Sequence, residues 1–217
     1  MKNRLRSTTA ALVLAGASLI AASAQGAPQT YQIDPVHSHA EFTIRHLFSK
    51  VTGSFVKFQG KISYDAANPA QSTVQAEIDA SSIDTNSDRR DNHLRSADFF
   101  DVAKYPTITF TSTKVTPGEG GKLLIEGQLT MHGVSKPVTL DGAFLGAGPG
   151  LNGGSSAGFE ASTQLDRKEF GIVWNKSLDQ GGTLLGDDVK VSLEIEGVQA
   201  PAAGGTAPPK EASKSGK

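Results

Sequence analysis

The 217-residue sequence contains no cysteine, only one tryptophan, and no marked excess of charge of either sign. The absence of cysteine excludes disulfide scaffolds, thiol catalysis, iron–sulfur clusters and cysteine-ligated zinc. Lys and Arg total 21 against 22 Asp and Glu, a formal net charge of −1, whereas a nucleic-acid binder would show a strongly basic domain or stripe. A hydrophobic content of 37% is too high for a disordered chain. The composition therefore predicts one globular domain held together by packing, with no nucleic-acid partner.

The first 24 residues have the features of a secretory signal peptide. Three basic residues precede an apolar run over residues 8–22, and a small-residue Ala-Ser-Ala site ends at residue 24. An uncleaved anchor is the alternative, but the run is short for a span of about 20 residues. We expect cleavage before Gln25, export to the periplasm, and no transmembrane segment afterwards.

The last residues, 199–217, consist of small residues, Pro, Gly and Lys with almost nothing to bury. Such a segment does not offset the entropy lost on ordering, so we predict a disordered tail. The folded domain is expected over residues 28–198.

Apolar residues alternate with polar ones along most of this domain, which is the signal of strands with one wet face. The eight candidate strands cover residues 39–46, 56–65, 73–80, 108–115, 122–131, 134–144, 159–165 and 189–198. A sheet of this kind has almost no helix to cover its apolar face, so it closes on itself or folds into two packed sheets. An eight-stranded barrel has room inside for side chains or one small ligand. The sequence predicts an all-β, antiparallel fold of one of these two kinds.

One segment, residues 85–106, breaks the alternation. Residues that can cap a helix open it, and we expect a short helix near Arg89 to Arg95, followed by a second turn that starts at Ser96, so that the helical segment lies near residues 88–102. Phe99 and Phe100 are adjacent and do not both fit one narrow stripe. At least one of them is expected to plug the barrel end or line its mouth.

Five histidines are the candidates for acid–base chemistry or metal binding at neutral pH. His37 and His39 are two apart and could ligate zinc, but no HExxH motif or carboxylate cluster supports that reading, and solvated side chains are favoured. His46 shares the parity of Phe42 and Ile44, which leaves a structural role and a hydrogen-bonding role toward a ligand equally open. No nucleophile elbow and no phosphate-binding glycine pattern is present. We therefore predict no catalytic residue, no metal and no cofactor.

Several strings resemble the YceI-like family, the lipocalin-like polyisoprenoid-binding proteins of the bacterial periplasm. The resemblance is carried by IDPVHSHAEFTIRH, RDNHLRSADFFD, LTMHGVSKPV and LDRKEFGIVWN, in family order across nearly the whole domain. It implies an eight-stranded antiparallel lipocalin-like barrel that holds a long-chain lipid with a polar head, such as a polyisoprenoid, a quinone precursor or a fatty amide. It implies carriage, storage or sensing of that ligand, and no enzyme.

Strand parity then predicts the residues that contact the ligand, because a lipid site is mostly apolar with a few placed polar groups. The predicted tunnel wall is Phe42, Ile44, Phe58, Ile62, Ile78 and Phe110, with Phe99, Phe100 and Trp174 near the mouth and His46, His93 and Asn175 as head-group contacts. Two other hypotheses remain: an exported enzyme or metal-binding protein acting on such a lipid through its histidines, and a partner-binding module. A homodimer is left open.

Overall fold

The computed structural model describes residues 28–150, 154–179 and 181–199. The predicted signal peptide lies outside the described residues, and so does the predicted tail from residue 200 onward. Gln199, which we expected to begin that tail, is the last residue of a strand, and its side chain accepts a hydrogen bond from Ser155 Oγ at 2.8 Å. Among the helices of the described part, none is long and apolar enough to cross a membrane.

The described chain is almost entirely strand, with one α-helix, α1 (Asp88–Arg95). The strands are β1 (Gln29–Ile33), β2 (His39–His46), β3 (Ser49–Phe55), β4 (Phe58–Tyr64), β5 (Thr73–Asp79), β6 (Ile83–Asp84), β7 (Thr107–Pro117), β8 (Lys122–Met131), β9 (Val134–Pro149), β10 (Ser155–Asp166) and β11 (Leu185–Gln199). Short 3₁₀ turns lie at Pro69–Gln71, Ala80–Ser82, Glu119–Gly121 and Arg167–Phe170. All eight sequence-predicted segments are strands.

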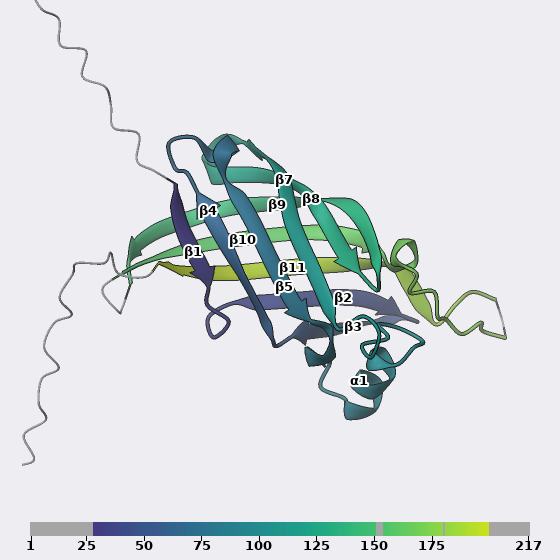
Figure 1. Ribbon diagram of the computed structural model, residues 1–217. Coiled ribbons are helices and arrows are strands. Elements are labelled where there is room, and N and C mark those ends of the chain that lie inside the picture. Colours follow the sequence, from purple (N-terminus) through teal and green to yellow (C-terminus); the bar gives the residue numbers. More distant parts are fainter. Residues whose placement is uncertain (1–27, 151–153, 180, 200–217) are drawn as a thin grey trace, which may run out of the picture.

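Eight strands close into an antiparallel barrel, which settles the choice between barrel and sandwich. The hydrogen-bonded order is β1-β4-β5-β7-β8-β9-β10-β11, and β11 returns to pair with β1. Strands β1 and β4 cross β11 and β2 at a steep angle (Figure 1). Every pairing is antiparallel, so inward and outward side chains alternate around the whole wall.

The barrel closes at β11, which pairs with β10 along one edge and with two strands in succession along the other. β2 pairs with residues 185–194 of β11, and β1 pairs with residues 197 and 198. The turn between β1 and β2 is fixed there by Ser38, which is buried. Its hydroxyl accepts from the Glu196 N–H at 2.9 Å and donates to the Glu196 carbonyl at 3.3 Å. The backbone of β11 is thus satisfied where its neighbour changes.

Strands β1 and β3 did not show in the alternation, although β1 helps to close the barrel. β1 buries one large side chain, Tyr31, within a polar run. β3 carries Gly53 on its inner face, where an added Cβ would lie 2.6 Å from Phe42 Cζ. The glycine therefore leaves room for the Phe42 ring and at the same time interrupts the apolar pattern. Val56, the first residue of the predicted strand over residues 56–65, lies outside β4 and is exposed.

Helix α1 follows the two-residue strand β6 and lies at the barrel end near β2 and β3 (Figure 1). Its α-helical part ends at Arg95, and residues 97–100, expected to continue the helical segment, form hydrogen-bonded turns. Ser87 stands at the N-cap without a side-chain hydrogen bond. The turn before the helix is held by buried Asp91, which accepts from both the N–H and the hydroxyl of Thr85. Arg95 donates to the carbonyls of Ser81 and Ile83, both at 2.7 Å.

The opposite barrel end is closed by aromatic rings. Tyr64 stacks on Phe144 with centroids 4.4 Å apart, and Phe159 lies 5.7 Å from Tyr64 and 6.1 Å from Tyr31. Tyr31, Tyr64 and Phe159 are buried and belong to the main hydrophobic core. Burial raises the pKa of the Tyr64 hydroxyl above its usual value. The barrel interior is therefore packed shut at the end remote from α1.

Candidate functional site

Two adjoining cavities occupy the barrel between these ends. The outer cavity, beside α1, has a volume of about 560 Å³. The inner cavity, deeper in the barrel, has a volume of about 190 Å³ and reaches Tyr64 and Phe159 of the aromatic closure. Five side chains line both cavities: Phe42, Phe55, Met131, Leu165 and Val191. One elongated space thus leads from α1 to the closed end, within the range of volumes that small-molecule sites show.

The inner cavity has an almost wholly apolar wall, made by the inward faces of the barrel strands. Glu41 and Glu160 belong to its lining residues, but both are exposed and turned to the outside. The Thr163 hydroxyl donates to the Thr139 carbonyl at 2.9 Å, and the Ser72 hydroxyl accepts from the Asp65 N–H at 3.1 Å. The third hydroxyl among the lining residues belongs to Tyr64, at the closed end. This part of the barrel therefore offers a ligand mainly apolar contacts.

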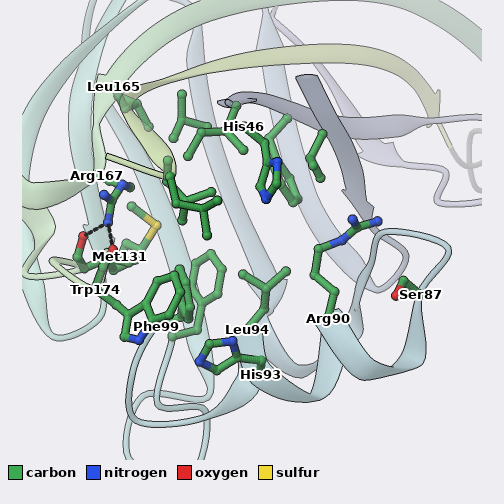
Figure 2. A pocket seen from close by; sticks show the side chains of 18 of the residues that line it. His46, Ser87, Arg90, His93, Leu94, Phe99, Met131, Leu165, Arg167 and Trp174 are labelled. Carbon is green, nitrogen blue, oxygen red and sulfur yellow. Dashed lines mark hydrogen bonds between the residues drawn. The ribbon is translucent and has the colours of Figure 1, made fainter. Parts of the chain in front are cut away.

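The outer cavity has an apolar wall with a polar fringe. Its lining includes His46 from β2, Arg90 and His93 from α1, and Arg167 after β10. Figure 2 shows His46 and Arg90 entering the space from opposite sides. No aspartate or glutamate is among its described lining residues, and Arg89, which lines it, is exposed. The cavity therefore reaches the surface beside α1, and its polar fringe is basic.

Eleven of the twelve predicted ligand-binding residues line these two cavities. The outer cavity is lined by Phe42, Ile44, His46, His93, Phe99, Phe100 and Trp174, and the inner cavity by Phe42, Phe58, Ile62, Ile78 and Phe110. That these side chains contact a ligand remains a prediction.

The structure does not bring Asn175 to the cavity. Its side-chain amide donates to the Leu185 carbonyl at 2.9 Å and accepts from the Leu185 N–H at 3.0 Å. Both hydrogen-bonding groups are therefore engaged in joining the segment after Trp174 to the start of β11. Adjacent residues of an extended segment point to opposite sides, so Asn175 lies off the wall that Trp174 lines, and its contact with a head group stays a prediction.

Arg167 is the main residue that the sequence reasoning missed. It is 4% exposed, and its Nη1 donates to the carbonyls of Ile172 at 2.7 Å and Trp174 at 2.8 Å, as Figure 2 shows. Nη2 lies 3.1 Å from Asp187 Oδ1, and Nε donates to Gly186. The signal was present, because Arg167 continues the inward parity of Phe159 and Leu165 on β10. A buried arginine at that position shapes the segment that carries Trp174.

His93 belongs to an aromatic cluster at the outer cavity. Its ring lies edge-on to Phe99 at 5.0 Å and to Trp174 at 4.9 Å, and those two rings are 5.1 Å apart. Its Nε2 lies 2.8 Å from Asp98 Oδ2. This hydrogen bond lies at the surface, and the same ring also forms part of the cavity wall. Within the described residues, the ring nitrogens of His46 make no hydrogen bond, and only its carbonyl accepts one, from Ser49. The ring lines the outer cavity and is available to a ligand there.

Arg90 is held in place from its own turn. Its Nε donates to the Thr85 hydroxyl and its Nη2 to the Thr85 carbonyl, each at 2.7 Å. A guanidinium has five N–H donors, so Nη1 and one hydrogen of Nη2 remain for other partners. The arrangement presents a fixed cation at the wall of the outer cavity.

One group within the described ranges has the geometry to hold a metal ion: Asp34, His37 and Glu196, whose ligand atoms lie within 4.8 Å of one another. His37 Nδ1 lies 2.8 Å from Asp34 Oδ2, and this hydrogen bond lowers the pKa of Asp34 and raises that of His37. His37 is exposed, and none of the three residues has a lining position in the outer cavity. Of the two histidines that the sequence offered as zinc ligands, His37 belongs to this group and His39 does not.

A protein-family model described as a YceI-like domain matches residues 31–197, which is nearly all of the described barrel. The chain belongs to the YceI-like family. A UPF0312 protein of Vibrio cholerae serotype O1 is 40% identical over 197 residues, which cover 90% of this chain and 100% of that protein.

Solved structures show the same fold. BcnA of Burkholderia cenocepacia superposes with a TM-score of 0.68 at 24% identity, covering 76% of this chain and 98% of that one. A structure described as a polyisoprenoid binding domain from Saccharophagus degradans gives a TM-score of 0.58 at 17% identity, covering 78% and 98%. At these identities the likeness establishes the barrel and nothing finer.

Proposed function

We propose that this YceI-like protein binds one long-chain amphiphile inside its barrel, for carriage, storage or sensing of that lipid. The observation that carries the proposal is the gradient along a single elongated space: an apolar inner cavity with a closed end, and a wider outer cavity with His46, His93 and Arg90 at its wall. An amphiphile has the same gradient along its length.

The hydrocarbon chain would occupy the inner cavity and the head group the outer one. Each buried CH₂ contributes roughly 0.8 kcal/mol, so a long chain binds tightly without an ionic contact. His46 is the side chain best placed to meet the head group, because its ring faces the cavity and is not committed elsewhere. His93 is held by Asp98 and would contribute mainly its ring face.

A polyisoprenoid, an isoprenoid quinone precursor and a fatty amide all fit this description. The Saccharophagus degradans domain, described as polyisoprenoid-binding, supports the first of these for a barrel of the same fold. Export through residues 1–24 to the periplasm belongs to the same proposal and is supported by the sequence of that segment.

We propose a binding role and no catalytic step. The outer cavity offers no carboxylate among its described lining residues, and His93 is paired with Asp98. Four of the five N–H donors of Arg167 are engaged by backbone carbonyls and Asp187. An acid–base pair of the usual kind, two titratable groups within hydrogen-bond reach of one reacting atom, is not assembled in the described part of this cavity. The alternative, an exported enzyme that acts on the lipid, would have to depend on His46.

The first experiment is native mass spectrometry of the mature protein isolated from its own host, followed by identification of any released molecule. A stoichiometric long-chain adduct supports the carrier role. An apo mass that is unchanged after incubation with geranylgeraniol, a long-chain quinone and a fatty amide would reject it. Turnover of any of these probes, lost in His46→Leu, would favour the enzyme.

A matched pair of variants tests whether the barrel interior is the binding site. Ala161 lines the inner cavity, so Ala161→Phe is expected to fill it and to abolish binding of geranylgeraniol. Ala66 is exposed in the turn after β4, and Ala66→Phe adds the same ring outside the barrel. Equal probe binding by both variants would place the ligand elsewhere.

A further inference from the structure

An apolar side chain is fully exposed at the tip of the β2–β3 hairpin. Leu47 and Phe48 form the two-residue turn, and Phe48 makes no burying contact with the barrel. Val173, which is 62% exposed, lies between Ile172 and Trp174, both of which line the outer cavity. Large apolar side chains are thus presented to the outside on segments that frame the cavity.

Hydrogen bonds tie the hairpin tip to the outer cavity. The Leu47 N–H donates to the Leu184 carbonyl at 2.9 Å, and His46 is paired with Leu185 in the ladder between β2 and β11. His46, Leu184 and Leu185 all line the outer cavity. The tip is therefore hydrogen-bonded to the cavity rim, at the barrel end where α1 also lies (Figure 1).

Basic side chains surround the tip. Arg45 and Lys50 are directly opposite each other across the hairpin and are both exposed. Lys176 is exposed, and its carbonyl accepts from the Leu184 N–H at 2.9 Å. Leu184 in turn accepts from Leu47 of the hairpin tip, so Lys176 lies close to the tip. Within the described ranges none of these three cations makes an ion pair, while nearby Asp187 is already engaged by Arg167 and Lys168. Like charges directly opposite each other destabilise a hairpin, so this pairing is not explained by folding.

We propose that the β2–β3 tip docks the barrel onto an anionic lipid bilayer, with Phe48 inserted at the interface and Arg45, Lys50 and Lys176 against lipid phosphates. Apolar residues flanked by Lys and Arg are the side chains that interfacial anchors use. A protein partner fits less well, because isolated apolar side chains fall far short of the roughly 800 Å² per partner that stable protein interfaces bury. Docking in this orientation brings the end of the outer cavity to the membrane surface.

Vesicle flotation with the full mature chain tests the proposal. Vesicles of phosphatidylcholine mixed with phosphatidylglycerol are expected to bind the protein, and vesicles of phosphatidylcholine alone to bind it weakly. Phe48→Ser is expected to lower the partition coefficient by about tenfold or more, as loss of one inserted aromatic side chain implies. Leu145→Ser is the matched control, because Leu145 is also an exposed apolar residue, with 62% of its surface accessible. It follows Phe144, which pairs with Phe159, and so lies at the opposite barrel end.

Charge reversal supplies a second, independent comparison. Lys50→Glu and Lys176→Glu are each expected to weaken binding to the anionic vesicles by about fivefold or more, in line with the contribution of a basic residue near an anionic surface. Lys122→Glu, exposed at the start of β8, is the control. The proposal is rejected if the tip variants and their controls lose vesicle binding equally, or if the wild type does not bind anionic vesicles. Loss of a dimer in Phe48→Ser with vesicle binding intact would assign the tip to a second copy instead and also rejects it.

The docking surface and the lipid cavity are separable. Ala161→Phe, which fills the inner cavity, is expected to leave vesicle flotation unchanged, and Phe48→Ser is expected to leave equilibrium binding of geranylgeraniol in detergent unchanged. Failure of one test therefore does not imply failure of the other.

Discussion

The guanidinium of Arg167 donates to the main-chain carbonyl of Trp174 at 2.8 Å. This hydrogen bond holds the backbone of a residue that lines the outer cavity. The same Nη1 also holds the Ile172 carbonyl, which lies two residues earlier. After the 3₁₀ turn Arg167–Phe170, the described part of the segment that leads to β11 forms no strand ladder, only the isolated bridge between Ser177 and Thr183. Its conformation near the cavity depends on Arg167 rather than on a strand ladder.

We predict that Arg167→Met lowers the free energy of unfolding by about 2–4 kcal/mol, because buried carbonyl groups lose their donors. The tryptophan fluorescence of Trp174 is expected to shift to longer wavelength as the segment loosens. Urea denaturation followed by fluorescence measures both effects. Lys168→Met is the control: it removes only the exposed pair with Asp187, worth less than about 1 kcal/mol. Similar losses in the two variants would contradict the role of Arg167.

The turn before α1 depends on buried Asp91, which is 4% exposed and accepts two hydrogen bonds from Thr85. We predict that Asp91→Ala destabilises the protein by about 1–3 kcal/mol, because the Thr85 N–H loses its partner in a buried site. In Asp91→Ala, amide hydrogen exchange is expected to speed up relative to the wild type more in α1 than in the barrel strands. Asp88→Ala, exposed on the same helix, is expected to change little, and an equal effect there would show that helix charge alone is responsible.

Sequence alternation predicted the wall of the barrel well, since the period of two is imposed directly by strand geometry and burial. Phe42, Phe58 and Phe110 follow this rule and all line the cavities. Asn175 did not follow it, because no ladder sets its orientation, and its amide instead satisfies the backbone of Leu185. Irregular segments take their conformation from distant partners that a local pattern does not contain.

Strand β3, which the alternation did not predict, illustrates the same limit. Gly53 breaks the apolar face of β3, yet it does so because Phe42 packs against it. That contact joins neighbouring strands across their pairing, so it can be understood only when the hairpin is known. Arg167 is the converse case: its inward parity was visible in the sequence, but an arginine is rarely buried unless its donors are satisfied. Its acceptors lie up to 20 residues further along the chain.

Glycine at position 127 is predicted to be required by the inner cavity wall. A Cβ there would lie 2.4 Å from Phe110 Cζ and 2.6 Å from the Thr111 carbonyl oxygen. Gly127→Ala is therefore expected to cost about 1–3 kcal/mol through overpacking and to weaken lipid binding by moving the Phe110 ring. At Gly148 an added Cβ meets nothing within 4 Å, so Gly148→Ala should be neutral within about 0.5 kcal/mol. Thermal unfolding of the two variants decides the comparison, and equal melting temperatures would refute it.

The His37–Asp34 pair at the β1–β2 turn should produce a pH dependence of its own. The hydrogen bond to Asp34 raises the pKa of His37 above its ordinary value of 6.5, and the same bond lowers the pKa of Asp34 below 3.8. A raised histidine pKa stabilises the fold fully below pH 6.5, and the gain is lost as the pH rises through the folded-state pKa. A lowered aspartate pKa stabilises above pH 3.8, and that gain is lost as the pH falls through its folded-state value. The pair thus supports the turn most between these two limits.

An NMR titration of the His37 ring protons tests this assignment. The wild-type midpoint is expected above 6.5, and Asp34→Asn should return it toward the ordinary value while its amide oxygen still accepts from the Val36 N–H. Glu196→Gln should cause a smaller change, because Glu196 acts on the pKa of His37 only through its charge and is the weakest of the causes. A midpoint that Glu196→Gln lowers more than Asp34→Asn would show that β11, and not the turn itself, controls the protonation of His37.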